Sequence, residues 1–117
     1  MSGWIELRKI KPTEADAENG RVIVWHAFQG AMICHISKVV DNSFFSHWMR
    51  IPADGWIDFY DHQPTEADAD ETGCIMARRG ESAVNVIGWK QMQSAYLNLW
   101  QRTPDPPEDY DILYKKY

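Results

Sequence analysis

Two acidic loops contain the residues of this 117-residue sequence that come nearest to a metal-binding pattern. The segment 68–73 alternates carboxylates and places Gly73 at the sixth position, as a calcium-binding loop does. Such a loop needs a bidentate glutamate at its twelfth position, where this sequence has Arg79. The spacing is broken in the related segment 16–20. We therefore interpret both loops as capped, solvated turns.

A zinc site would draw on four histidines and two cysteines, which lack the paired spacing that zinc ligands show. Cys34 and His35 are adjacent, and neighbours on a strand face opposite sides of the sheet. We expect no metal and no cofactor. Two cysteines are too few for a disulfide framework and are typical of a reducing cytosol. The residues considered are His26, His35, His47, His62, Cys34 and Cys74.

Catalytic patterns are missing from the sequence. Ser46 and His47 are neighbours in a predicted strand, so we expect their side chains to point to opposite faces. The sequence has neither a glycine-rich phosphate loop nor a His-Glu-x-x-His motif. We predict no catalytic residues and a protein that is not an enzyme.

Six tryptophans are the unusual feature of the composition. Four of them recur at one fixed spacing, which predicts packing positions: Trp4, Trp48, Trp56 and Trp100. Trp25 and Trp89 do not align with each other and lie beside charged or polar residues, as interface tryptophans do. Arg78 and Arg79, with Lys90, form the compact basic group in the middle of the chain. We predict that a partner binds four of these residues: Trp25, Trp89, Arg78 and Arg79.

A net charge of −5 argues against nucleic acid as that partner, because phosphate binding requires a clustered cationic face. No apolar run is long enough to span a bilayer, and the N-terminus lacks the basic and apolar regions of a signal peptide. We expect an unidentified protein partner, no membrane association, a cytoplasmic location and a monomer or homodimer.

The elements that position these residues come from a duplication. The hexapeptide 12–17 (Pro-Thr-Glu-Ala-Asp-Ala) recurs 52 positions later as 64–69. The same offset relates Trp4-Ile5 to Trp56-Ile57 and Trp48 to Trp100. We predict a single domain over residues 1–117 with internal repeats at about 4–53 and 56–107.

Each repeat has the pattern of a small antiparallel unit. The hexapeptide predicts either one helical turn or a structured loop, capped by threonine and ended by Gly20 or Gly73. Two β-branched runs around a glycine-containing turn predict a hairpin, and an aromatic run predicts a third strand that ends at proline. The segments 37–43 and 89–95 are either loop or short helix. The fold class is therefore mainly β, with two tandem three-stranded antiparallel units forming one pseudo-two-fold domain.

The tail 108–117 has no counterpart in the other repeat. Its apolar residues Ile112, Leu113 and Tyr114 predict docking on the body or on a second copy, with disorder as the alternative.

The repeat ends resemble a family of short phage and prophage proteins of unknown function. Members open with Trp-Ile, carry a proline-glutamate loop before a valine-rich strand, and close with a His-Trp-Met segment, matched here by His47-Trp48-Met49. The second repeat departs from this pattern, with Leu99 in place of the histidine and Gln101 in place of the methionine. The resemblance implies a phage or prophage origin and an accessory role, and it implies no reaction.

Three functional hypotheses follow. The first is a non-enzymatic phage or prophage accessory protein that acts by binding another macromolecule, and a purely structural role, such as that of a minor virion component, fits the same sequence features. The alternative is a small-ligand binder or minor enzyme that uses a cleft between the two repeats.

Overall fold

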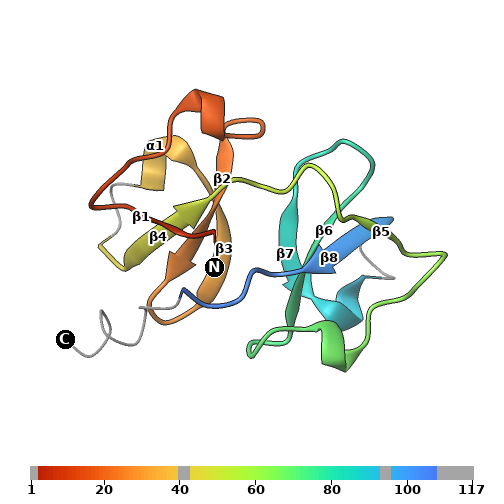
Figure 1. Ribbon diagram of the computed structural model, residues 1–117. Coiled ribbons are helices and arrows are strands. Elements are labelled where there is room, and N and C mark those ends of the chain that lie inside the picture. The colour runs from red at the N-terminus through yellow and green to blue at the C-terminus, as the bar shows by residue number, and fades with distance from the viewer. Residues whose placement is uncertain (1–2, 40–42, 93–95, 108–117) are drawn as a thin grey trace. The chain divides into compact units, whose positions relative to one another are not determined.

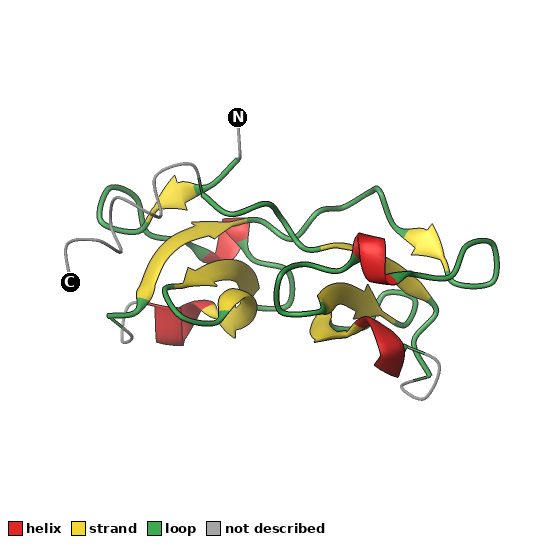
Figure 2. Cartoon of the chain, turned by 90° about the horizontal axis from the view of Figure 1, so that it is seen from below, coloured by secondary structure: helices red, strands yellow, loops and turns green. Residues whose placement is uncertain are grey.

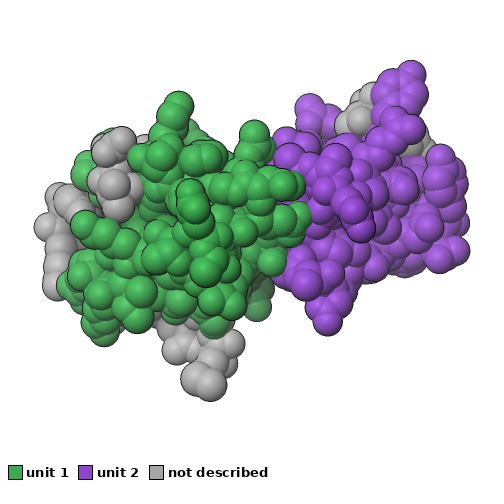
Figure 3. All heavy atoms as spheres, turned by 90° about the horizontal axis from the view of Figure 1, so that it is seen from above, with its two compact units in different colours: residues 1–51, 104–117 green, residues 52–103 purple. Residues whose placement is uncertain are grey.

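Short runs rich in β-branched and aromatic residues form two antiparallel sheets in the computed structural model of the chain (Figure 1). The structure describes residues 3–39, 43–92 and 96–107. One sheet lies in each of two units, the first made of residues 1–51 with 104–117 and the second of residues 52–103 (Figure 3). The predicted mainly β fold is confirmed.

The two sheets have the same topology. The first sheet has the strand order β1-β4-β2-β3, and the second has the corresponding order β5-β8-β6-β7. All pairs of neighbouring strands are antiparallel. The strands of the first sheet are β1 (Ile5–Glu6), β2 (Arg21–His26), β3 (Gly30–His35) and β4 (Phe45–Met49). Those of the second sheet are β5 (Ile57–Asp58), β6 (Cys74–Arg78), β7 (Asn85–Gly88) and β8 (Leu99–Arg102).

Each unit contains one strand more than the sequence predicts. The additional strands are β1 and β5, which follow the Trp-Ile start of each repeat. Ile5 pairs with Trp48, and Ile57 pairs with Trp100. These strands are two residues long, and only their pairing with the last strand of the unit gives them extended geometry. The start of each repeat is therefore an edge strand and not a free end.

The helical segments are short, as Figure 2 shows in red. Each hexapeptide forms a helical turn, but the prediction that Gly20 or Gly73 ends it is wrong, because the turns end at Asp16 and Asp68. The two segments left open between loop and helix each contain a helical turn in their described part. None of the described helices is long and apolar enough to cross a membrane. The helical segments are η1 (Glu14–Asp16), α1 (Ile36–Val39), η2 (Glu66–Asp68) and η3 (Trp89–Gln91).

The capped turn is built in the same way in both units. In the first unit, the Oδ2 atom of Asp16 accepts hydrogen bonds from the Thr13 backbone N–H at 2.9 Å and from the Thr13 hydroxyl at 3.0 Å. Its other oxygen accepts from Arg50, just after β4, at 2.6 Å. These hydrogen bonds, led by the one from the Thr13 backbone, lower the pKa of Asp16. The carboxylate thus ties the loop to the end of the last strand.

Asp68 repeats this arrangement in the second unit. It accepts from the Thr65 backbone N–H at 2.9 Å and from the Thr65 hydroxyl at 3.0 Å. Arg102 donates to its other oxygen at 3.2 Å. Because the same three residue types make the same bonds, the duplicated hexapeptide has a structural role in both units.

One fully buried tryptophan lies at the centre of the core in each unit. The indole N–H of Trp48 donates to the carbonyl of Ile10 at 2.7 Å, and that of Trp100 donates to the carbonyl of His62 at 2.8 Å. Trp48 packs with Val22, Val24 and Val39, whereas Trp100 packs with Ile75, Ala77 and Met92. The predicted core role is confirmed for these two tryptophans. Trp4 and Trp56 are only half-buried.

The chain beyond the second repeat belongs to the first unit. The indole N–H of Trp4 donates to the carbonyl of Asp105 at 2.6 Å, and residues 104–107 lie in the first unit although the predicted second repeat extends to residue 107. The tail 108–117 lies outside the described residues. The prediction of one domain stays a prediction, because each unit is described by itself.

We predict that Trp48→Phe lowers the free energy of unfolding by about 2 kcal/mol, since the carbonyl of Ile10 loses a buried donor and part of the core volume is lost. Trp100→Phe should have an effect of the same sign, because its bond to His62 is equivalent. Urea unfolding followed by circular dichroism measures both. The exposed Tyr60→Phe serves as the control and should stay within about 0.5 kcal/mol of the wild type. A Trp48→Phe variant as stable as the wild type would contradict this role of the indole.

Candidate functional site

Aromatic side chains gather at the β2–β3 hairpin end of the first sheet. The centroid of the His26 ring lies 5.4 Å from that of Phe44, 5.6 Å from that of Phe45 and 6.2 Å from that of Phe28. The Phe28 and Phe44 rings are 5.3 Å apart and meet at 64°. Phe28 is 63% exposed and Phe44 is 49% exposed, whereas His26 beneath them is 8% exposed. We call His26, Phe28 and Phe44 the hairpin patch.

The backbone of the hairpin holds these rings in place. The register between β2 and β4 shifts between Trp25 and His26, and this irregularity pairs His26 with Phe45. The Ala27 N–H donates to the carbonyl of Phe44 at 2.9 Å, which joins the turn to the residue before β4. Phe44 accepts this hydrogen bond, and Phe28 directly follows its donor Ala27. The bond therefore brings the two exposed phenylalanines together.

The His26 side chain organises the turn and keeps one donor available. Its Nδ1 atom accepts from the backbone N–H groups of Phe28 at 3.1 Å and Gln29 at 3.2 Å. A ring nitrogen that accepts hydrogen bonds carries no proton, so the proton of the neutral imidazole is on Nε2. Among the residues that the structure describes, this Nε2–H has no acceptor. The patch thus combines two exposed rings with a largely buried N–H donor.

The second unit builds the same corner from different residues. There the Arg79 N–H donates to the Ser82 hydroxyl at 3.1 Å, and the Gly80 N–H donates to the side-chain oxygen of Asn98 at 2.9 Å. Tyr96, at the position of Phe44, is 80% exposed. The hairpin patch is therefore a feature of the first unit, within a scaffold that the two units share.

Two of the predicted partner-binding residues occupy equivalent positions in the two units. Val24 pairs with Trp48 and Ala77 pairs with Trp100, so the next residues, Trp25 and Arg78, correspond to each other. Each lies against the first tryptophan of its own unit. The Trp25 ring meets that of Trp4 edge-on at 6.0 Å, and the Arg78 guanidinium lies 5.4 Å from the ring centroid of Trp56. Trp25 is half-buried and Arg78 is buried, so much of each predicted contact surface packs internally.

The other two predicted residues lie in the second unit. Trp89 begins η3 and packs, half-buried, against the core cluster around Trp100, with the Lys90 ammonium 5.6 Å from its ring centroid. The backbone N–H of Trp89 donates to the Gly73 carbonyl at 3.0 Å. In the first unit, the backbone N–H of Ile36 donates to the Gly20 carbonyl at 2.8 Å in the same way. Arg79 is exposed. The four predicted residues are divided between the two units, and their partner-binding role stays a prediction.

The hairpin patch was not predicted from the sequence. Phe28 stands alone in a turn, and Phe44 is separated from it by the strand β3 and the helix α1. The available signal was a difference between repeats, because the second hairpin turn carries no aromatic residue where the first carries Phe28.

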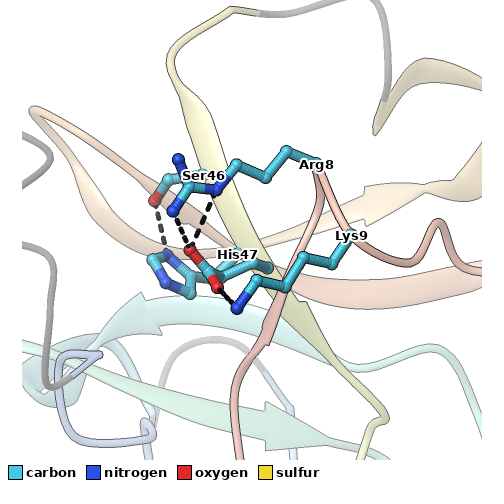
Figure 4. Close-up of polar contacts among 5 residues, drawn as sticks. Arg8, Lys9, Ser46 and His47 are labelled. Atoms are coloured by element: carbon cyan, nitrogen blue, oxygen red, sulfur yellow. Dashed lines mark hydrogen bonds and ion pairs between the residues drawn. The ribbon is translucent and has the colours of Figure 1, made fainter.

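Ser46 and His47 lie closer together than their neighbouring positions on a strand predict. The Ser46 Oγ and the His47 Nδ1 are 2.7 Å apart (Figure 4). The expectation that the two side chains point away from each other is therefore wrong: a serine Oγ lies close enough to the backbone to reach around the strand. His47 is 2% exposed, with Trp4 edge-on to its ring at 6.4 Å. His47 is therefore buried in the sheet, whereas Ser46 is half-buried.

The carboxylate of Glu6 lies near this pair and forms ion pairs with two cationic residues that follow β1 in the chain. Glu6 pairs with His47 across β1 and β4, and its carboxylate accepts from Arg8 at 2.8 Å and from Lys9 at 2.6 Å. Figure 4 labels Arg8 and Lys9 and marks their interactions with dashed lines. The hydrogen bond from Lys9, with those from Arg8, lowers the pKa of Glu6. Glu6 is therefore an ion-pair partner that secures the end of the edge strand β1.

In the loop that resembles a calcium site, the Asp70 carboxylate accepts hydrogen bonds from other residues of the chain. Asp70 accepts from the Thr72 hydroxyl at 2.6 Å, the Cys74 N–H at 3.0 Å and the Thr103 hydroxyl at 2.8 Å. Burial raises the pKa of Asp70, but these hydrogen bonds together outweigh burial and lower it below its ordinary value. Residues 3–39, 43–92 and 96–107 contain no group of three or more His, Cys, Asp and Glu side chains placed to hold a metal ion.

No protein-family model, curated protein or solved structure matches the chain.

Asp70 gives a testable pH dependence. Because its pKa is lower in the folded chain than in the unfolded chain, the ionised carboxylate stabilises the fold above the unfolded pKa, and this stabilisation is lost as the pH falls through the folded pKa. We expect the difference in free energy of unfolding between the wild type and Asp70→Asn to be largest near neutral pH and to shrink as the pH falls from about 5 to 2. Urea unfolding at several pH values measures it.

The exposed Glu81→Gln serves as the control for the change in net charge. A difference between the wild type and Asp70→Asn that stays constant over this pH range would contradict the structural role of the Asp70 carboxylate.

Proposed function

We propose that this chain is a non-enzymatic accessory protein of phage or prophage origin that acts in the cytoplasm by binding another protein through the hairpin patch. The observation that carries this proposal is the pair of exposed rings of Phe28 and Phe44 over the buried His26. Aromatic side chains that expose apolar area at a fixed geometry are typical of binding surfaces, because they lose little conformational entropy on binding.

The comparison between the two units supports a functional role for this place. The buried tryptophan, the Thr-Asp turn and the Arg-Asp pair recur in both units, as folding requires. The hairpin ends differ, with Phe28 and His26 in one unit and a turn held by Asn98 in the other. Two copies of one scaffold are free to differ where the residues do not hold the fold.

The non-enzymatic part of the proposal is supported by how the polar residues are used. The carboxylates of Glu6, Asp16 and Asp70 bond to side chains and backbone groups that secure loops and strand ends. The phage or prophage origin rests on the resemblance carried by the Trp-Ile starts and His47-Trp48-Met49.

Site-specific photo-crosslinking tests the proposal. A photo-reactive amino acid in place of the exposed Gln29, beside Phe28, leaves the patch itself unchanged. We expect a discrete protein adduct after irradiation in bacterial lysate, and we expect at least a tenfold lower yield when Phe44→Ala is added. The matched control carries the photo-reactive amino acid in place of the exposed Glu81, in the hairpin turn of the second unit.

Adducts of the same proteins in the same yield from both positions, or an adduct at Gln29 that Phe44→Ala leaves unchanged, would refute binding through the hairpin patch. Mass spectrometry of the adduct band identifies the bound protein.

A further inference from the structure

We propose that the hairpin patch recognises an extended, proline-rich segment of its partner, an inference that rests on the proposed function and names the chemistry of the bound segment. The juxtaposition that carries it is the His26 Nε2–H donor beneath the exposed rings of Phe28 and Phe44.

The two exposed rings fit proline better than a charged or strongly polar group. The Phe28 and Phe44 rings meet at 64°, and both are largely exposed. The described residues that flank them, Ala27, Gln29 and Ser43, are uncharged. Proline-rich segments dock on aromatic surfaces in a preformed extended conformation, so little entropy is lost on binding.

The donor supplies the second element of recognition. A proline-rich segment has no internal hydrogen bonds, so its carbonyl groups are free to accept. Proline also lacks a backbone N–H, so a binding site for it needs donors more than acceptors. The Nε2–H of His26 is such a donor, because Nδ1 is already occupied by the N–H groups of Phe28 and Gln29.

The first unit already binds a proline-rich stretch of its own chain through one hydrogen bond from an aromatic ring N–H. The indole N–H of Trp4 donates to the carbonyl of Asp105 at 2.6 Å, between Pro104 and Pro106. An aromatic residue with an N–H donor therefore binds a proline-flanked carbonyl in this unit. The hairpin patch likewise combines aromatic rings with a ring N–H donor: Phe28 is 63% exposed, Phe44 is 49% exposed, and His26 beneath them is 8% exposed.

A second copy of the chain fits the patch less well. With about 150–250 Å² per aromatic side chain, the exposed parts of Phe28 and Phe44 amount to about 200 Å². A stable dimer buries about 800 Å² on each partner. The patch is thus the size of a contact with one or two residues of a linear segment.

Selection from a random twelve-residue peptide library on the intact chain tests the inference. We expect the selected peptides to be enriched in proline, and we expect the affinity of a selected peptide, measured by fluorescence anisotropy, to fall at least tenfold in Phe28→Ala and in Phe44→Ala. Tyr96→Ala removes the equivalent exposed ring of the second unit and should leave the affinity unchanged. Circular dichroism confirms that each variant is folded.

A substitution of His26 separates its two roles. In His26→Asn, the side-chain oxygen can replace Nδ1 as the acceptor for the turn, while the Nε2–H donor is lost. We expect about fivefold weaker peptide binding, the effect of one neutral hydrogen bond. In the wild type, the imidazole Nε2–H proton should become protected from exchange with water when the peptide is added, which a purely structural role of His26 would not produce.

The other outcomes distinguish the two proposals. Selected peptides that lack proline but lose affinity in Phe28→Ala would overturn this inference and leave binding through the patch intact. Failure to select any peptide whose binding depends on Phe28 and Phe44 would contradict both proposals.

A dimer in sedimentation that Phe28→Ala abolishes would assign the patch to a second copy. Peptide binding that strengthens tenfold when Ile112, Leu113 and Tyr114 are replaced by serine would assign it to the chain's own tail. Either of these last results would overturn the inference.

Discussion

The hydrogen bond from a buried indole N–H to a carbonyl of the loop after the first strand is the interaction on which each unit depends. Trp48 makes it to Ile10 and Trp100 makes it to His62. A buried indole without an acceptor would destabilise the fold, so the loop must lie where its carbonyl meets the ring. One side chain therefore fixes the last strand, the loop and the core around them.

The rest of each unit follows from this arrangement. The first strand pairs directly with the strand that carries the tryptophan, and the loop continues into the capped turn. Asp16 then binds Arg50, two residues beyond Trp48, and Asp68 binds Arg102 in the same way. The hairpin completes the sheet on the other side of the unit. With the core and both ends of the last strand secured, the hairpin end is free to carry residues that the fold does not need.

Much of the scaffold could be predicted from the sequence because local chemistry determines it. The duplicated hexapeptide contains its own capping residues, and the buried tryptophans recur at a fixed spacing. The first strand of each unit was not predicted, because two residues such as Ile5–Glu6 have no strand pattern of their own and become a strand only by pairing with β4. The equivalence of Trp25 and Arg78 likewise becomes visible only from the strand register. Trp25 packs against Trp4 in the first unit, and Arg78 packs against Trp56 at the same position of the second unit.

The candidate site was harder to predict than the scaffold. Phe28 and Phe44 are far apart in the sequence and meet only because the Ala27 N–H binds the Phe44 carbonyl. The role of His26 depends on which ring nitrogen faces the turn, and no spacing rule gives that orientation. Residues that recur in both repeats therefore determine the scaffold, whereas the proposed function depends on residues that only one unit carries.

The central claim is that the fold presents Phe28 and Phe44 without needing them. The free energy of unfolding of the double variant Phe28→Ser/Phe44→Ser, measured by urea unfolding against the wild type, tests it most directly. Because both rings are exposed, we predict a loss of less than about 1 kcal/mol. A loss of several kcal/mol, as for truncation of a buried aromatic side chain, would show that the two rings serve the core and would contradict the account.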